Sequence, residues 1–159
     1  MDNKEEIPGV RLLNIDEVLF SLRGIPQSYI DKLMTGEEII NVDVDIAFIK
    51  SKGEERIGVK LSFIYSVNFE GEILNVLEYK NITWFALINA PYKEQDNDTY
   101  DIPENLIKFV ASPAYSTARG IIYSRTAHSF LINYILPLTD SNQLFQHYKA
   151  LQQKRTVNQ

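Results

Sequence analysis

Cysteine is absent from this chain of 159 residues. Without a thiol there is no disulfide framework, no thiolate ligand for zinc and no cysteine nucleophile. Histidine is scarce as well, because His128 and His147 are the only two, and a lone histidine on a helix is more often structural than catalytic. We therefore expect no metal site.

Positive charge is in short supply. The chain has 16 lysines and arginines against 21 aspartates and glutamates, which gives a net charge of -5 at pH 7. A protein that binds nucleic acid needs a basic stripe to neutralise phosphates. The composition therefore argues against a nucleic-acid partner and favours a basic protein partner.

Long apolar runs are also missing, whereas a helix that spans a bilayer needs about 20 apolar residues. The longest run, residues 82–90, has the length of a strand and contains Thr83 and Asn89. The first six residues are mostly charged and lack the apolar core of a secretory signal. We therefore expect a cytoplasmic protein without membrane insertion.

The sequence lacks the usual catalytic motifs. It has no Gly-x-Ser-x-Gly elbow and no glycine loop for phosphate, since its glycines are dispersed. Asp43 and Asp45 share one face of a predicted strand and could hold a metal, but such a pair more often forms a solvated polar face. We predict that the protein is not an enzyme. A small enzyme with a ligand cavity between sheet and helices is the weakest of the alternatives.

Alternating hydrophobic patterns predict four strands in what is most simply one domain. The turn Glu70-Gly71-Glu72 predicts that the last two strands pair antiparallel. Residues 82–88 are apolar on both strand faces, which indicates helices on one face and another subunit on the other. The four predicted strands cover residues 10–22, 39–49, 56–69 and 73–88.

Residues 24–36 connect the first two strands and combine turn formers with apolar side chains, among them Tyr29, Ile30, Leu33 and Met34. Two interpretations remain open. The segment is either a short helical turn that covers the edge of the core or a mobile apolar loop beside a binding surface.

A long helical region begins near Pro103, where Asp101 and Glu104 have the spacing of a capping box. Pro113 is expected to interrupt this helix or to restart it with Ser112 as the cap, because an internal proline removes a backbone hydrogen bond.

The C-terminal part begins with residues 133–138, which are predicted to be extended because of Pro137. A last amphipathic helix then follows, capped by Thr139, Asp140 or Ser141. We expect a flexible tail at 1–9, a single domain at 10–153 and a frayed tail at 154–159. The fold class is α+β, a four-stranded antiparallel sheet with two C-terminal helices packed on one face.

With this order of elements established, the chain resembles the SecB export-chaperone family over residues 10–153. The segments that carry the resemblance are Arg11-Leu12-Leu13-Asn14-Ile15-Asp16, Asn41-Val42-Asp43-Val44-Asp45, Val76-Leu77-Glu78-Tyr79 with Phe85, Pro103-Glu104-Asn105-Leu106, Ala118-Arg119 with Ile122, Leu136-Pro137-Leu138, and Leu144-Phe145 with Tyr148.

The resemblance implies a homotetramer, a dimer of dimers, that holds unfolded precursor proteins and passes them to the SecA motor without catalysis and without a cofactor. It implies that an acidic strand surface binds SecA, and the matching positions are Asp16, Val76 and Glu78. The client-binding positions that it implies are Tyr29, Ile30, Leu33, Met34, Phe145 and Tyr148. Packing inside the domain is an equally open interpretation of these six.

One departure from the family pattern favours a second function. An acidic position near the end of the first strand is replaced by Ser21 or Leu22, and the C-terminus is basic. The alternative is a dedicated adaptor or toxin–antitoxin-associated chaperone with one cognate protein partner, because a fold alone does not decide the client.

Overall fold

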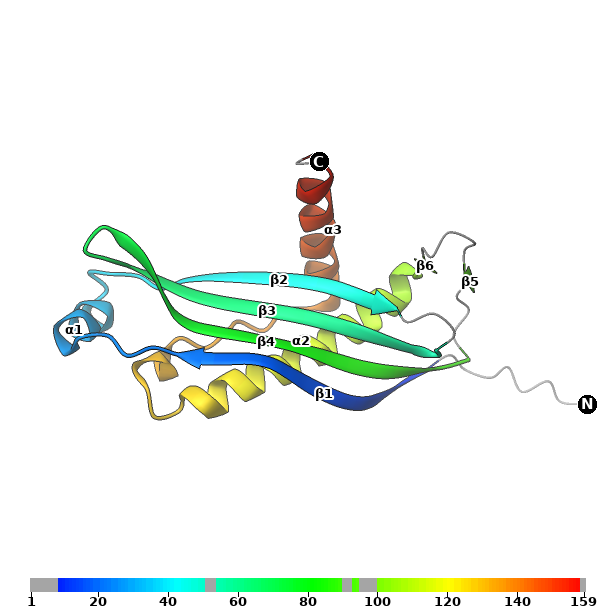
Figure 1. Ribbon diagram of the computed structural model, residues 1–159, viewed down its shortest axis with the longest axis horizontal. Coiled ribbons are helices and arrows are strands. Elements are labelled where there is room, and N and C mark those ends of the chain that lie inside the picture. Colours follow the sequence, from blue (N-terminus) through cyan, green and yellow to red (C-terminus); the bar gives the residue numbers. More distant parts are fainter. Residues whose placement is uncertain (1–8, 51–53, 90–92, 95–99, 158–159) are drawn as a thin grey trace, which may run out of the picture.

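The computed structural model describes residues 9–50, 54–89, 93–94 and 100–157. Its main element is an antiparallel sheet in the order β1-β4-β3-β2 (Figure 1). The predicted fold class is confirmed, as is the antiparallel pairing of the last two strands. The strands are β1 (Gly9–Leu22), β2 (Asn41–Lys50), β3 (Arg56–Phe69) and β4 (Glu72–Ile88).

The two central strands explain why the sheet has one buried face. Along β4, buried side chains alternate with half-buried ones, so that Tyr79, Asn81 and Thr83 point inward while Lys80 and Ile82 point outward. We call these the inner and outer faces. Alternation with period two is a property of any strand, and burial of one face fixes the register.

Helices cover the inner face. The long helix α2 (Glu104–Thr126) runs beneath the sheet, and α1 (Gln27–Thr35) lies at one end of it (Figure 1). The 3-10 helix η1 (Phe130–Asn133) and α3 (Ser141–Val157) follow. The side chains of α2 that are buried are Ile107, Val110, Ala111, Ala114, Tyr115, Ala118, Ile122 and Thr126.

Two predictions about α2 are wrong. Pro113 lies inside the helix and does not end it. Because proline has no N–H, the carbonyl of Phe109, four residues earlier, lacks its helical hydrogen bond. Phe109 and Pro113 are both on the exposed side of the helix, where solvent can bond that carbonyl. The capping box does not form either, because the N-cap position of α2 is Pro103 and no side chain caps it. Asp101 belongs to the short strand β6 (Tyr100–Asp101), which pairs with β5 (Lys93–Glu94).

The last helix begins with a cap formed by Asp140. The Gln143 backbone N–H donates to the Asp140 carboxylate at 2.9 Å, and the Asp140 N–H donates to the Gln143 side chain at 3.3 Å. This reciprocal pair stabilises the first turn and selects one of the three predicted caps. The helix continues to Val157, into the segment expected to be frayed. Of the expected N-terminal tail, the structure describes only Gly9, where β1 begins.

Candidate functional site

The crossover between β1 and β2 is anchored through α1. The Tyr29 hydroxyl donates a 2.5 Å hydrogen bond to the carbonyl of Asn68, and its ring packs edge-on against Phe69 at 5.0 Å. Burial raises the pKa of Tyr29, and the nearby Glu38 carboxylate raises it further. Of the two interpretations of this segment, the helical turn that covers the core edge is confirmed.

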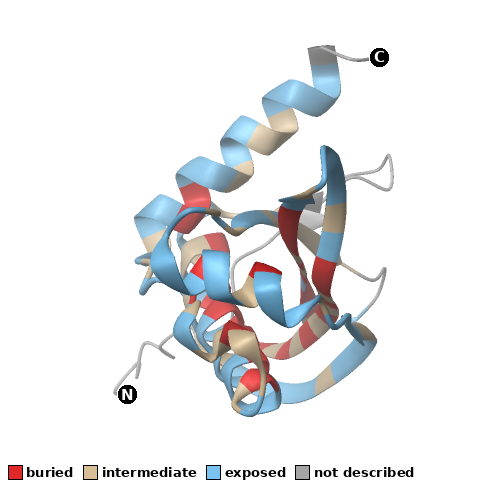
Figure 2. Cartoon of the chain, turned by 90° about the vertical axis from the view of Figure 1, so that its left-hand side faces the viewer, coloured by how far each residue is buried: buried red, intermediate tan, exposed pale blue. Residues whose placement is uncertain are grey.

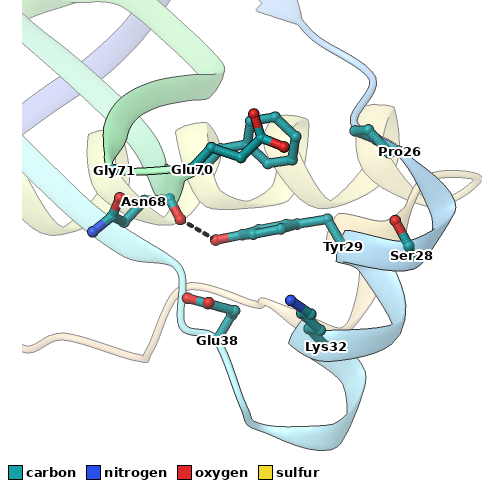
Figure 3. Close-up of a pocket in the computed structure, with 9 residues that line it drawn as sticks. Pro26, Ser28, Tyr29, Lys32, Glu38, Asn68, Glu70 and Gly71 are labelled. Atoms are coloured by element: carbon teal, nitrogen blue, oxygen red, sulfur yellow. Dashed lines mark hydrogen bonds between the residues drawn. The ribbon is translucent and has the colours of Figure 1, made fainter.

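A polar pocket lies between α1 and the β3–β4 turn (Figure 3). It has a volume of about 430 Å³. Charged side chains at its rim are Lys32, Glu38 and Glu70, and the Tyr29 ring lies between them. This pocket borders the crossover, but its polar lining gives an apolar segment little to contact.

A second pocket of about 430 Å³ lies beside β2 and has a mainly apolar lining. It opens between the start of β2, the extended linker before α3 and the first turns of α3. Its lining residues are Val42, Val44, Tyr115, Leu136, Pro137, Thr139, Gln143, Leu144 and His147. We call this pocket, together with the adjoining edge of β2, the β2 groove.

β2 forms one edge of the four-stranded sheet, because its one neighbour in that sheet is β3. The side chain of His147 reaches this edge, with Nε2 2.7 Å from the Val44 carbonyl. A residue in a strand directs its N–H and C=O to the same side, and the next residue directs them to the other. Because the Val44 carbonyl points away from β3 toward His147, the backbone N–H and C=O groups of Val42, Val44 and Ile46 all face away from β3.

The linker that forms the other wall is held in place by α2. Arg119 Nε donates to the Leu136 carbonyl at 2.5 Å, and the Tyr115 hydroxyl donates to the Pro137 carbonyl at 3.3 Å. These side chains donate hydrogen bonds to backbone carbonyl groups of the linker that are not bonded within a helix or sheet. The groove is therefore preformed rather than closed by a free loop.

Apolar side chains are exposed on the segments that border the β2 groove. A soluble domain exposes single apolar residues routinely, but several on adjoining segments mark a contact surface. At the α1 end, Asn133 donates to the Met34 sulfur at 3.6 Å, which places the linker against α1. The exposed apolar residues of these segments are Met34, Ile39, Val42, Ile135 and Leu138.

The predicted client-binding residues divide into two groups. Tyr29, Leu33 and Phe145 are buried, so their side chains pack inside the domain and are not available to a client in this structure. Ile30 and Tyr148 are half-buried, and Tyr148 packs edge-on against Phe48 at 4.9 Å. Met34, which is 57% exposed, is the one fully available side chain of the six.

The first turns of α3 pack on the domain and its later turns do not. Leu144 and Phe145 are buried, whereas residues 153–156 are exposed (Figure 2). Arg155 nevertheless reaches Asp45 on β2 and bonds both carboxylate oxygens at 2.9 Å. Asp45 is thus committed to an ion pair and is not part of a metal site.

The three positions matched to SecA binding do not form one surface. Val76 is only 1% exposed and belongs to the core, so its side chain cannot contact a partner. Asp16 and Glu78 both lie on the outer face, but at different positions along the paired strands. Asp16 is opposite Ile82, and Glu78 is opposite Ser21. Asp16 accepts hydrogen bonds from Trp84 and Asn14, and Glu78 accepts one from Asn75.

Sequence reasoning missed most of the β2 groove. The alternating pattern placed Val42 and Val44 on one strand face, but no signal in it shows that β2 is an edge strand. His147 was set aside as a lone histidine, and its bond to Val44 depends on residues 103 positions apart. Within the described residues, no group of acidic or histidine side chains could hold a metal ion, and no helix is both long and apolar enough to cross a membrane.

No family model matches the sequence, and no curated protein matches it. Among solved structures, the chain is similar to the Mycobacterium tuberculosis SecB-like chaperone Rv1957 in complex with a peptide from the HigA1 antitoxin. That likeness has a TM-score of 0.49 at 12% identity and covers 82% of this chain and 90% of the other. A protein of unknown function from Streptococcus agalactiae is also similar, with a TM-score of 0.37 at 10% identity, over 84% of this chain and 97% of that one.

Proposed function

We propose that this protein is a non-catalytic chaperone that holds extended apolar segments of unfolded proteins in the β2 groove. The observation that carries the proposal is the coincidence of a sheet edge with an apolar pocket. Val42 and Val44 belong to both, since their backbone groups face away from β3 and their side chains line the pocket. A client strand takes the place of His147 at the Val44 carbonyl. Such an arrangement binds a chain by its backbone and its apolar side chains together.

Backbone pairing explains why binding would not depend on sequence. An extended client segment adds a strand to β2 through its main chain, and every other side chain then enters the pocket. Unfolded chains expose apolar side chains, whose burial contributes about 25 cal/mol per Å². Holding a client needs no bond-making chemistry, which agrees with the expectation that the protein is not an enzyme.

A proline substitution tests the edge directly. Val42→Pro removes an outward N–H that β3 does not use, and proline is tolerated at such edge positions. We expect the variant to remain folded and to lose most of its suppression of aggregation when mixed at equal amounts with an unfolded substrate. Val42→Ala keeps the N–H and should retain more activity.

The control for these variants is Ile73→Pro, at an exposed apolar residue in the β3–β4 hairpin that does not line the groove pocket. Its effect on suppression should be small once its folding is verified by circular dichroism. If wild-type protein suppresses no aggregation and binds no unfolded chain, the proposed function is wrong.

We propose further that several copies of the chain associate. The resemblance to the SecB family implies such an assembly, a dimer of dimers. β1 is the other sheet edge, and it exposes Leu12, Leu13 and Val18, two of them at register shifts where pairing with β4 is irregular. Unpaired apolar edges favour association. Light scattering at micromolar concentration should give a mass above that of one chain, and a stable monomer would contradict this.

The client class separates a general chaperone from a dedicated adaptor. A general export chaperone would retain many precursor proteins from a lysate and hand them to a motor with a basic segment. A dedicated adaptor would retain one stoichiometric partner. Capture on the wild-type protein and on the Val42→Pro variant, compared band by band, distinguishes groove-dependent partners from the background.

A further inference from the structure

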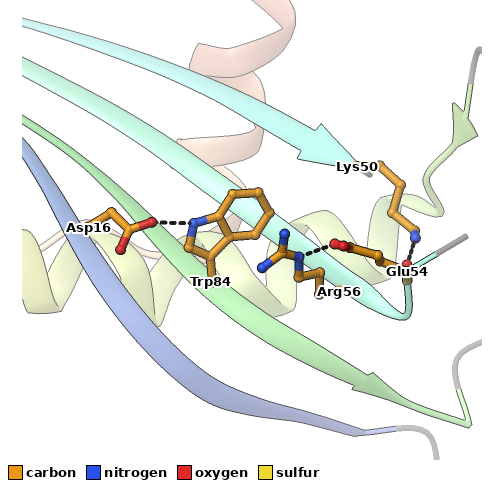
Figure 4. Close-up of polar contacts among 5 residues, drawn as sticks. All are labelled: Asp16, Lys50, Glu54, Arg56 and Trp84. Atoms are coloured by element: carbon orange, nitrogen blue, oxygen red, sulfur yellow. Dashed lines mark hydrogen bonds and ion pairs between the residues drawn. The ribbon is translucent and has the colours of Figure 1, made fainter. Parts of the chain in front are cut away.

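The outer face of the sheet holds a cluster that the proposed client groove does not use. Its centre is Trp84, the only tryptophan of the chain. The indole N–H donates to the Asp16 carboxylate at 2.9 Å, and the Arg56 guanidinium carbon lies 4.4 Å from the ring centroid (Figure 4). Arg56 in turn forms an ion pair with Glu54.

The indole is fixed against the sheet. A Cβ at Gly58 would lie 2.9 Å from Trp84 Cζ3 and 3.1 Å from Ile82 Cγ2. Gly58 therefore provides the space in which the ring lies flat on the backbone of β3. With Gly58 on one side and Arg56 on the other, neither ring face is open to stack on a nucleic-acid base.

Cross-strand pairing shows which charges surround Trp84. Arg11 and Arg56 lie on either side of Ala86, and Asp16 and Lys60 lie on either side of Ile82. Paired residues on one face are about 5 Å apart, and diagonal neighbours about 7–8 Å apart. Three cationic side chains and one carboxylate thus frame the indole at neighbouring rungs.

The Asp16 carboxylate is already hydrogen-bonded, whereas two of the cationic side chains have no ionic partner among the described residues. Asp16 accepts hydrogen bonds from both Trp84 and Asn14. Arg11 and Lys60 are exposed and form no ion pair within the described part of the chain. The excess of free charge around Trp84 is therefore positive, although the whole chain carries a net charge of -5.

We propose that this part of the outer face, which we call the Trp84 surface (Arg11, Arg56, Lys60, Ile82, Trp84 and Ala86), docks an acidic, extended segment of a partner protein. Carboxylates would pair with Arg11, Lys60 and the free terminal nitrogens of Arg56, and an apolar side chain between them would lie on Ile82 and Ala86. Complementary charge steers such an encounter and excludes basic partners.

The opposite end of the same face carries the opposite charge. Asp45 shares the rung of Lys80, and Asp43 and Glu78 lie on the rung beyond it. Arg155 pairs with Asp45 and Lys80 with Glu78, so Asp43 is the carboxylate of this group that has no partner within the described residues. The outer face is therefore divided. At the Trp84 end the carboxylates of Asp16 and Glu54 are already bonded to Trp84 and Arg56, so a basic partner finds its unpaired carboxylate, Asp43, at the far end. This division is why the acidic segment is assigned to the Trp84 surface and not to the whole face.

Tryptophan fluorescence tests the proposal, because all emission from indole in this protein comes from Trp84. The probe is a labelled synthetic peptide of about ten residues, the length of a long strand, in which glutamate or aspartate alternates with leucine. The control peptide has lysine or arginine in place of each glutamate or aspartate. We expect the acidic peptide to shift the Trp84 emission in a saturable, salt-dependent manner and the basic peptide to leave it unchanged.

Charge reversal identifies the surface. Arg11→Glu/Lys60→Glu should weaken binding of the acidic peptide about tenfold or more. Lys149→Glu/Lys154→Glu changes the total charge equally on α3 and should change the affinity less than about twofold. Should the first variant fail to fold by circular dichroism, Arg11→Ala/Lys60→Ala replaces it with the same expected direction.

Three results would overturn the proposal: no emission change with the acidic peptide, an affinity that survives reversal of Arg11 and Lys60, or a stronger response to the basic peptide. Binding in the β2 groove is distinguished by Val42→Pro. That variant should bind the acidic peptide normally if the Trp84 surface is the site, and loss of the emission change in it would also count against the proposal. The outcome is independent of whether the groove holds unfolded chains.

Discussion

The indole N–H of Trp84 on β4 donates a 2.9 Å hydrogen bond to the carboxylate of Asp16 on β1, 68 residues earlier in the chain. The bond crosses two neighbouring strands on the outer face and fixes the ring over Gly58. It also accounts for an acidic residue that the resemblance had assigned to a partner. Asp16 has a structural partner inside its own domain.

Replacing Asp16 should therefore cost stability. A hydrogen bond to a charged group contributes about 1.5–3 kcal/mol, and less where it is exposed. We expect Asp16→Ala to lower the free energy of unfolding by about 1 kcal/mol and to change the Trp84 emission of the folded state. Asp43→Ala is the matched control, because Asp43 is exposed and has no partner in the described part of the chain. Equal urea midpoints for the two variants would contradict the prediction.

Gly58→Ala should be destabilising although alanine suits a strand better than glycine. The added Cβ would lie within 3.1 Å of Ile82 and within 2.9 Å of the Trp84 ring, and crowding of this kind costs about 1–3 kcal/mol. Combining it with Trp84→Leu should recover part of the loss, since contacting residues are not additive. Urea unfolding of the four proteins in the cycle measures the coupling, and strict additivity would show that the ring does not lie over Gly58.

Two tyrosine variants should differ in sign. Tyr29→Phe removes the hydrogen bond to the Asn68 carbonyl and should lower the free energy of unfolding by about 1 kcal/mol. Tyr65→Phe removes a buried hydroxyl that has no hydrogen-bond partner among the described residues. Its stability should be unchanged or slightly higher, because the desolvation cost of that hydroxyl disappears. Denaturant unfolding at neutral pH compares them, and a larger loss for Tyr65→Phe would contradict the assignment.

Stability should fall on the alkaline side. Burial raises the pKa of Tyr65 and of Tyr79 in the folded protein, so the folded state keeps protons that the unfolded chain releases. The free energy of unfolding should be steady below about pH 10, the ordinary tyrosine pKa, and decline as the pH rises above it. Urea unfolding across this range measures the slope, which should be shallower in Tyr65→Phe. An equal slope in both proteins would exclude Tyr65 as a contributor.

Several elements could be predicted because their cause is local. The alternation of Val42, Val44 and Ile46 depends only on the period of a strand, and Gly71 with a φ of 87° forms the turn that the sequence predicts. Pro113 shows the limit of local rules. The tertiary contacts of Val110, Ala111 and Ala114 hold the helix together across a residue that breaks isolated helices.

The candidate site was less predictable because its parts come from distant segments. Tyr29 and Phe145 are apolar residues on short amphipathic helices, and sequence cannot distinguish a buried one from a client contact. The β2 groove needs Val44, Leu136 and His147 together, which only the crossover and the linker achieve. Exposure at the β2 edge likewise follows from strand order and not from composition.

The sequence by itself determined the class of this protein: four alternating strands, helices after them, a net negative charge and no cysteine to serve as a thiolate ligand. These properties depend on periodicity and composition, which need no neighbours. Only the tertiary structure decided that β2 is an edge strand beside an apolar pocket, that Val76 is buried and that Asp16 bonds Trp84. Those facts depend on which strands become neighbours and how the helices pack on them, since the hydrophobic pattern of a strand is the same at the edge of a sheet and in its middle.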